Sequence, residues 1–191
     1  MPEEKYINLL KYIEEKLPHL LENEEIWKTR WIKPDREGIK FKHTFERVYL
    51  PFKNFQIFIN VMHPVKNPEW HLHPRPAAFR VLSGSYRSTF SYFEIDREKR
   101  AYWSKEINPG DYYEMTNPKL GHFVDILTDE TLSVSVIGDP YGNHDAKYES
   151  LKYSGPPIDF IELPPQRKKE IINKTIIFYK NSTNPQKTFR H

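Results

Sequence analysis

The chain has 191 residues and a formal charge of only +3, because 29 Lys and Arg residues face 26 Asp and Glu residues. It has no cysteine, which excludes disulfides, thiolate zinc sites, iron–sulfur clusters and a cysteine nucleophile. At this length we expect a single domain over residues 1–191. The sequence lacks GxGxxG and GxxxxGK(S/T) motifs, which argues against a nucleotide-binding α/β fold.

Residues 1–37 are expected to form a helical N-terminal cap. Between residues 3 and 23 the apolar side chains recur at a spacing close to one helical face. This pattern predicts an amphipathic helix that covers one end of a sheet. Pro18 is expected to kink or restart that helix.

Residues 38–138 are expected to form a β-barrel. Short runs rich in Phe, Tyr, Val and Ile alternate there with clusters of Pro, Gly, Asn and Asp. Such spacing indicates an antiparallel sandwich or small barrel, not alternating βαβ units. The expected strands cover residues 39–49, 54–62, 70–73, 77–82, 85–95, 99–107, 111–115, 121–127 and 131–138.

Residues 139–191 are expected to be loop-rich and to end in a basic helix over about 166–179. From residue 165 onward the sequence has seven Lys or Arg residues and a single acidic residue, Glu170. A solvated helix face explains this charge better than a nucleic-acid surface, because no aromatic residues alternate with the basic ones. No apolar run reaches the ~18 residues of a membrane helix, and no secretory signal is visible. We therefore expect a cytoplasmic protein with neither a membrane nor a nucleic acid as partner.

The segment 70–86 contains a closely spaced histidine pair. In a strand, residues i and i+2 point to the same face, so His71 and His73 would project together. Two imidazoles supply two ligands of a metal site, and the third must come from another strand. The turn Pro109-Gly110-Asp111 leads into a segment that carries a lone histidine, His122. We expect this residue to be the third ligand.

An HxH pair followed by a glycine turn, and then PGD leading to a lone histidine, resembles the two motifs of the cupin superfamily. The resemblance covers about residues 60–138. It implies an all-β core, a cupin-type double-stranded β-helix (jelly-roll) barrel with a metal near its centre, here with an N-terminal helical cap and a C-terminal helix. It also implies a homodimer. The glutamate that cupins usually carry in the first motif would fall at Ala77, so the implied ligand set is three histidines without a carboxylate.

Within the superfamily the three-histidine pattern is most similar to the thiol dioxygenase (cysteine dioxygenase-like) branch. That branch binds a substrate carboxylate with an arginine upstream of HxH, and Arg47 is placed comparably, 24 residues before His71. A surface or salt-bridged Arg47 is the alternative. Arg75, next to the histidine pair, is a rival partner for an anion. Tyr86 and Tyr113 are expected as catalytic hydroxyls that orient a bound anion or oxygen, with packing as the alternative.

Three functions are consistent with these residues. The first is a non-haem dioxygenase that uses Fe2+, or else Ni2+, Mn2+, Cu2+ or Zn2+, on a small anionic chelating substrate such as a thiol carboxylate, with O2 as partner. The second is a metal-assisted isomerase or hydrolase of a small organic acid, with Glu114, Tyr86 or Tyr113 as general base. The third is a non-catalytic cupin-fold binding module.

Overall fold

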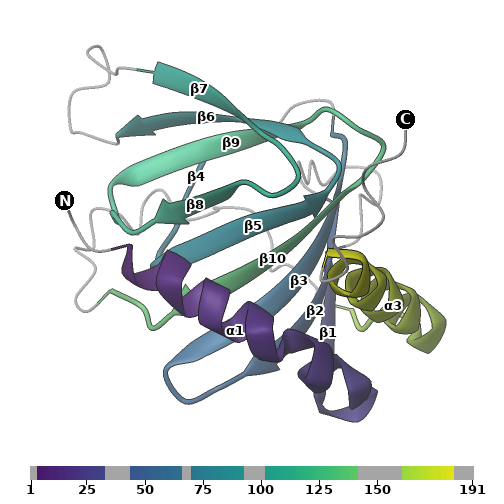
Figure 1. Ribbon diagram of the computed structural model, residues 1–191. Helices are drawn as coiled ribbons and strands as arrows, with labels where there is room; N and C mark the ends of the chain where they lie inside the picture. The colour runs from purple at the N-terminus through teal and green to yellow at the C-terminus, as the bar shows by residue number, and fades with distance from the viewer. Residues whose placement is uncertain (1–3, 33–43, 66–69, 93–101, 142–160, 183–191) are drawn as a thin grey trace.

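The computed structural model describes residues 4–32, 44–65, 70–92, 102–141 and 161–182. Within them the chain begins and ends with a long helix and has a β-rich centre (Figure 1). The helices are α1 (Lys5–Glu22), the short 3-10 helix η1 (Glu24–Ile26) and α3 (Pro165–Ser182). The strands are β1 (Lys28–Ile32), β2 (Thr44–Pro51), β3 (Phe55–His63), β4 (His71–Leu72), β5 (Ala77–Ser83), β6 (Tyr86–Tyr92), β7 (Tyr102–Ile107), β8 (Tyr112–Met115), β9 (Leu120–Ile126) and β10 (Thr131–Gly138).

The strands form two sheets in which neighbours run antiparallel. One sheet has six strands in the order β1-β2-β3-β10-β5-β8, and the other has four in the order β4-β9-β6-β7. The last eight strands thus alternate between β3-β10-β5-β8 and β4-β9-β6-β7. This is the strand order of an eight-stranded jelly roll, the architecture of cupins. The expected fold, an all-β jelly-roll core with a helix at each end, is confirmed.

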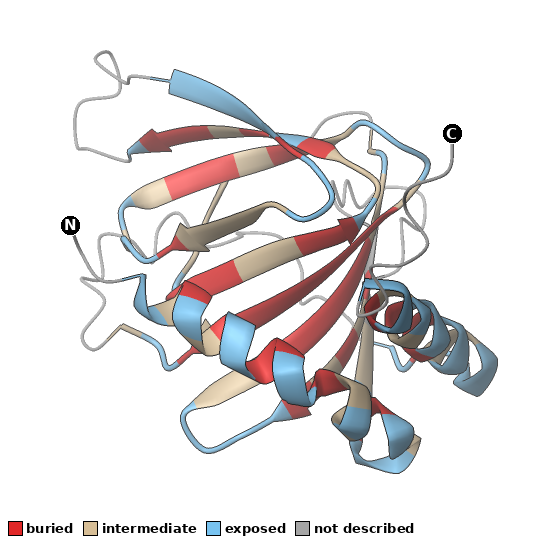
Figure 2. Cartoon of the chain, viewed as in Figure 1, coloured by how far each residue is buried: buried red, intermediate tan, exposed pale blue. Residues whose placement is uncertain are grey.

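The larger hydrophobic core lies on the outer face of the six-stranded sheet, not inside the barrel. Helix α1 crosses this face and α3 packs beside it (Figure 1). The strands under the helices are buried along most of their length (Figure 2). Every second residue of these strands points to this face. Examples are Val48, Ile59 and Val134, which pack there against apolar residues of both helices. A smaller cluster between the sheets consists of Val81, Tyr86, Ile107 and Val124. The residues between them point to the inner face of the sheet and are therefore left to line a cavity inside the barrel.

Helix α1 continues through Pro18 without a break, so the expected restart is wrong, and the expected kink there stays a prediction. Leu17 and Leu21, one on each side of the proline along the chain, are both buried in the outer core. Their packing offsets the hydrogen bond that proline cannot donate. The helix start is held by a distant residue, since the amide of Ile7 donates to Oε1 of Glu114 on β8 over 2.5 Å.

Both helical regions differ in extent from the sequence expectation. The segment 1–37 is not wholly helical, because Lys28–Ile32 forms β1 and extends the six-stranded sheet beside β2. A five-residue edge strand has too few residues to show a strand period after a strongly amphipathic helix. The C-terminal helix is longer than expected and begins at Pro165, whose missing amide hydrogen costs nothing at the first helical position. None of the described helices could span a membrane.

Ion pairs dock α3 on the barrel. Arg167 donates to both carboxylate oxygens of Glu46 on β2, over 2.9 and 2.6 Å. Lys174 pairs with Glu130, which lies just before β10. Burial disfavours the charged form of Glu46, but hydrogen bonds from Arg167 and His63 outweigh it and lower the pKa of this carboxyl. Part of the basic charge of the C-terminal segment therefore attaches the helix to the barrel.

Candidate metal centre

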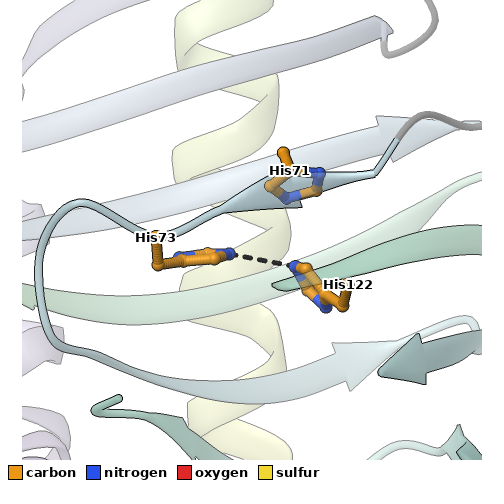
Figure 3. A group of neighbouring side chains, drawn as sticks. All are labelled: His71, His73 and His122. Carbon is orange, nitrogen blue, oxygen red and sulfur yellow. Dashed lines mark hydrogen bonds between the residues drawn. The ribbon is translucent and has the colours of Figure 1, made fainter. Parts of the chain in front are cut away.

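The structure brings His71, His73 and His122 together inside the barrel, with their rings facing one another (Figure 3). His71 lies on β4 directly opposite His122 on β9, and His73 follows β4 by one residue. One ring nitrogen from each histidine lies within 4.8 Å of the others. Ring centroids are 4.5 Å apart for His71 and His122 and 5.3 Å apart for His71 and His73.

The donor set fits a divalent metal ion. Nε2 of His73 and Nε2 of His122 lie 2.9 Å apart. Two nitrogens bound at right angles to one ion, at bond lengths of about 2.1 Å, would be about 3.0 Å apart. Desolvation, with the nearby charges of His71 and Arg47, lowers the pKa of His73 well below its usual value. His73 is therefore neutral at pH 7, which is the state that ligates metals.

A cavity of about 70 Å³ adjoins the three rings. Its volume suits a small molecule, not a polymer. No Asp or Glu occurs among the described residues that line it, so a bound cation would meet no carboxylate there. The lining residues are Arg47, Asn60, Met62, His63, His71, His73, Phe79, Tyr86, Tyr113, His122, Val124, Ile126 and Ser133.

Arg47 lies on the cavity wall and not on the outer surface. It stands opposite Asn60 in the register of β2 and β3, and its Nε donates to Oδ1 of Asn60 over 2.8 Å. Nδ2 of Asn60 in turn donates to Oγ of Ser135 on β10 over 3.1 Å. Burial, and to a lesser extent the charge of Arg30, lowers the pKa of Arg47 to about 10. Arg47 thus presents a positive charge to the cavity at neutral pH.

Tyr86 and Tyr113 meet at the cavity wall from opposite sheets. The hydroxyl of Tyr86 on β6 donates to the hydroxyl of Tyr113 on β8 over 2.8 Å. Burial raises the pKa of both phenols above its usual value, so both keep their protons at neutral pH. Since Tyr113 accepts from Tyr86, its own proton can be directed to a ligand. Phe79 stacks on the Tyr113 ring at 4.8 Å and fixes its plane.

Two residues proposed from the sequence lie away from the cavity. Arg75, in the turn between β4 and β5, is not among the cavity-lining residues, because that turn carries the chain from one sheet to the other. Its expected role in substrate binding is therefore not supported by its position. Glu114 caps helix α1 on the outer face, so it cannot be the general base of the hydrolase alternative.

Ser88 and Asn60 are polar residues of the site that sequence reasoning missed. The Oγ of Ser88 lies 2.7 Å from Nδ1 of His122, and Asn60 binds Arg47. The contact of Ser88 joins strands that are distant in the sequence, whereas Arg47 and Asn60 lie opposite each other on the consecutive strands β2 and β3. Alternation along a strand shows which face of the sheet a polar side chain points to, but it cannot show which residue of another strand that side chain will contact.

No protein-family model and no curated protein matches the chain. Among solved structures it is similar to Fe(II) HppE, with 13% identity and a TM-score of 0.42 over 56% of each chain. It is also similar to an oxalate decarboxylase from Lactobacillus farciminis in complex with formate, with 17% identity and a TM-score of 0.39 over 61% of this chain and 34% of that one. KdgF from Halomonas sp. shows 13% identity and a TM-score of 0.40 over 58% of this chain and 87% of that one. The chain spans about half the length of the first structures that it matches. The jelly-roll assignment rests on the strand order itself.

Proposed function

We propose that the protein is a mononuclear non-haem dioxygenase that binds Fe2+ through His71, His73 and His122. Its substrate is a small anionic chelator, and a thiol carboxylate is the class that we favour. The observation that carries the proposal is the convergence of three imidazoles on a small cavity that also contains Arg47 and has no carboxylate among its described lining residues. Three nitrogen ligands on one side of an ion leave open positions for a substrate and O2.

Ferrous iron would supply the site where substrate and O2 meet and where electron transfer to oxygen begins. The chain supplies charge and position. Three neutral imidazoles leave the charge of a divalent ion uncompensated, and Arg47 adds a further positive charge to the cavity. Together they favour an anion over a neutral molecule of the same size.

Arg47 would hold the carboxylate of the substrate. A guanidinium presents donors in a planar fork that matches a carboxylate. The hydrogen bond from its Nε to Asn60 fixes the plane of that fork, and Asn60 is itself held by Ser135. The substrate would therefore be oriented before it reaches the three histidines.

Tyr113 would donate a hydrogen bond to an oxygen atom of the substrate or product. The bond from Tyr86 polarises the Tyr113 hydroxyl and directs its proton away from Tyr86. Such a donor, aimed at developing negative charge in a small cavity, stabilises that charge. Tyr86 is then the positioning partner of Tyr113.

The cavity favours this function over a hydrolase or isomerase. Those reactions need a general base. The described cavity wall holds no carboxylate, its two tyrosines keep their protons at neutral pH, and Nε2 of His63 is paired with Glu46. The experiment is anaerobic reconstitution with Fe2+, followed by measurement of bound iron and of O2 uptake with small thiol carboxylates. The wild type should bind iron and consume O2, whereas His71→Ala should lose most of its iron. His19→Ala, on the exposed face of α1, is the control.

Two results would contradict the proposal. One is wild-type protein that binds no Fe2+, or a His71→Ala variant that binds it as well as the control. The other is turnover that continues unchanged under argon, which would identify a metal-assisted isomerase or hydrolase.

A further inference from the structure

Ser88 of β6 places a fully buried hydroxyl against the ring of His122. The Oγ of Ser88 lies 2.7 Å from Nδ1 of His122. The two residues are 0% and 2% exposed, so water cannot replace this contact. Buried hydroxyls are almost always hydrogen-bonded, and among the described residues the partner of Ser88 is this ring nitrogen.

The strand register fixes the His122 ring from two sides. Phe90 of β6 lies directly opposite His122, and Ser88 lies diagonal to it on the same face of the sheet. The Phe90 ring stacks on the imidazole at a centroid distance of 5.6 Å and an angle of 24°. Phe90 therefore sets the plane of the ring and Ser88 holds its Nδ1 edge. The opposite edge, with Nε2, faces His73.

The contact between His73 and His122 makes the position of the ring protons decisive. Their Nε2 atoms lie 2.9 Å apart, so one of them carries a proton when no ion is present. An ion bound to both needs a lone pair on both. A proton that leaves Nε2 of His122 must then reside on Nδ1, where Ser88 can accept its hydrogen bond. A hydroxyl can donate or accept, so Ser88 suits either tautomer, whereas a carboxylate could only accept.

We propose that Ser88 is a positioning residue of the metal centre, whose hydroxyl accepts the Nδ1–H of His122 and so directs the Nε2 lone pair toward the ion. This inference rests on the proposed metal centre and adds a residue outside the three ligands. Because Ser88 is neutral, the ligands and their support carry no negative charge. The arrangement thus preserves the positive charge that selects an anionic substrate.

The test measures the affinity of Zn2+, a redox-inert probe, for the full-length metal-free chain. Ser88→Ala should weaken Zn2+ binding by about 10–100-fold, the usual loss when a residue supporting a metal-bound histidine is removed. The matched control is Ser91→Ala. Ser91 lies on the same strand, is 1% exposed, and its hydroxyl donates to the carbonyl of Tyr92 instead of a histidine. This variant should stay within about twofold of the wild type.

A second measurement needs no variant and therefore does not depend on how Ser88→Ala folds. In the Zn2+-loaded, nitrogen-15-labelled wild type, the ring spectrum should show His122 protonated at Nδ1. An unprotonated Nδ1, or equal Zn2+ affinities for Ser88→Ala and Ser91→Ala, overturns the role of Ser88 and leaves the metal centre standing. If the wild type binds neither Zn2+ nor Fe2+, the proposed metal centre and this inference are both overturned.

Discussion

His71 on β4 and His122 on β9 are directly paired residues of neighbouring antiparallel strands. Strand β4 has only two residues, and its other pair joins Leu72 to Gly121. The backbone hydrogen bonds of so short a strand stabilise its attachment to β9 only weakly. An ion held by His71 and His122 would cross-link it to the sheet. Metal binding and local stability should therefore be linked.

We expect Zn2+ to stabilise the folded chain. A ligand that binds only the native state, at 100 times its dissociation constant, adds about 2.7 kcal/mol to the free energy of unfolding. Urea denaturation with and without the ion measures this increase, and a chelator should reverse it. His122→Ala should show no increase, whereas His19→Ala should respond like the wild type. An equal response in His122→Ala would place the ion elsewhere.

The three metal-ligand candidates were accessible from the sequence because their signals are local. The i and i+2 spacing placed His71 and His73 on one face, and the turn at Gly110 pointed to His122. Alternation of apolar residues and turn residues likewise located most of the strands. These patterns depend on the period of a strand, which neighbouring residues define by themselves.

What the sequence could not show depends on contacts between distant segments. Glu14 is an example, since the helical pattern gives no reason for a buried charge at that position. Its carboxylate accepts hydrogen bonds from Arg80 over 2.7 Å, Tyr112 over 2.6 Å and Tyr179 over 2.5 Å. These partners come from β5, β8 and α3. The contacts of Ser88 with His122 and of Asn60 with Ser135 escaped notice for the same reason, because sheet order, not strand period, brings those strands together.

Tyr113→Phe should lower kcat by about 100-fold or more, the usual loss when one donor to developing charge is removed. Tyr86→Phe should cause a smaller loss, because it removes only the bond that orients the Tyr113 hydroxyl. Steady-state O2 uptake measures both. Tyr12→Phe, on the exposed face of α1, serves as the control. If Tyr113→Phe leaves kcat unchanged, the two tyrosines serve only in packing and have no catalytic role.

The stability of the chain should fall in acid through Glu46. The pKa of this carboxyl is lowered in the folded state from its ordinary value of 4.5, against burial, by hydrogen bonds from Arg167 and His63. The contribution of Glu46 is therefore fully present above about pH 4.5 and is lost as the pH falls through the folded-state pKa. Glu46→Gln should cost about 1–3 kcal/mol at pH 7 and flatten the acid dependence.

Urea unfolding of the wild type and Glu46→Gln at pH 7 and below pH 4.5 tests this expectation. Glu15→Gln, an exposed carboxylate on α1, controls for the loss of one negative charge. If Glu46→Gln and Glu15→Gln have the same acid dependence, the ion pair with Arg167 does not anchor α3.

The turn between β5 and β6 depends on Gly84 for two separate reasons. Its φ of +70° is unfavourable for other residues, and an added Cβ would lie 2.3 Å from the carbonyl oxygen of Glu130. Gly110 offers a matched comparison, with a φ of +94° and no atom within 4 Å of an added Cβ. Gly110→Ala should therefore cost only the backbone strain, about 1–2 kcal/mol.

Gly84→Ala should cost clearly more than Gly110→Ala, because the atom in its way belongs to the backbone and cannot rotate aside. Chemical denaturation of both variants gives the difference, which isolates the steric part. The displaced turn leads directly into β6, the strand of Ser88 and Phe90. Gly84→Ala should therefore also weaken Zn2+ binding, whereas Gly110→Ala should not. Equal unfolding free energies for the two variants would show that the turn relieves the clash with Glu130 at no cost in stability.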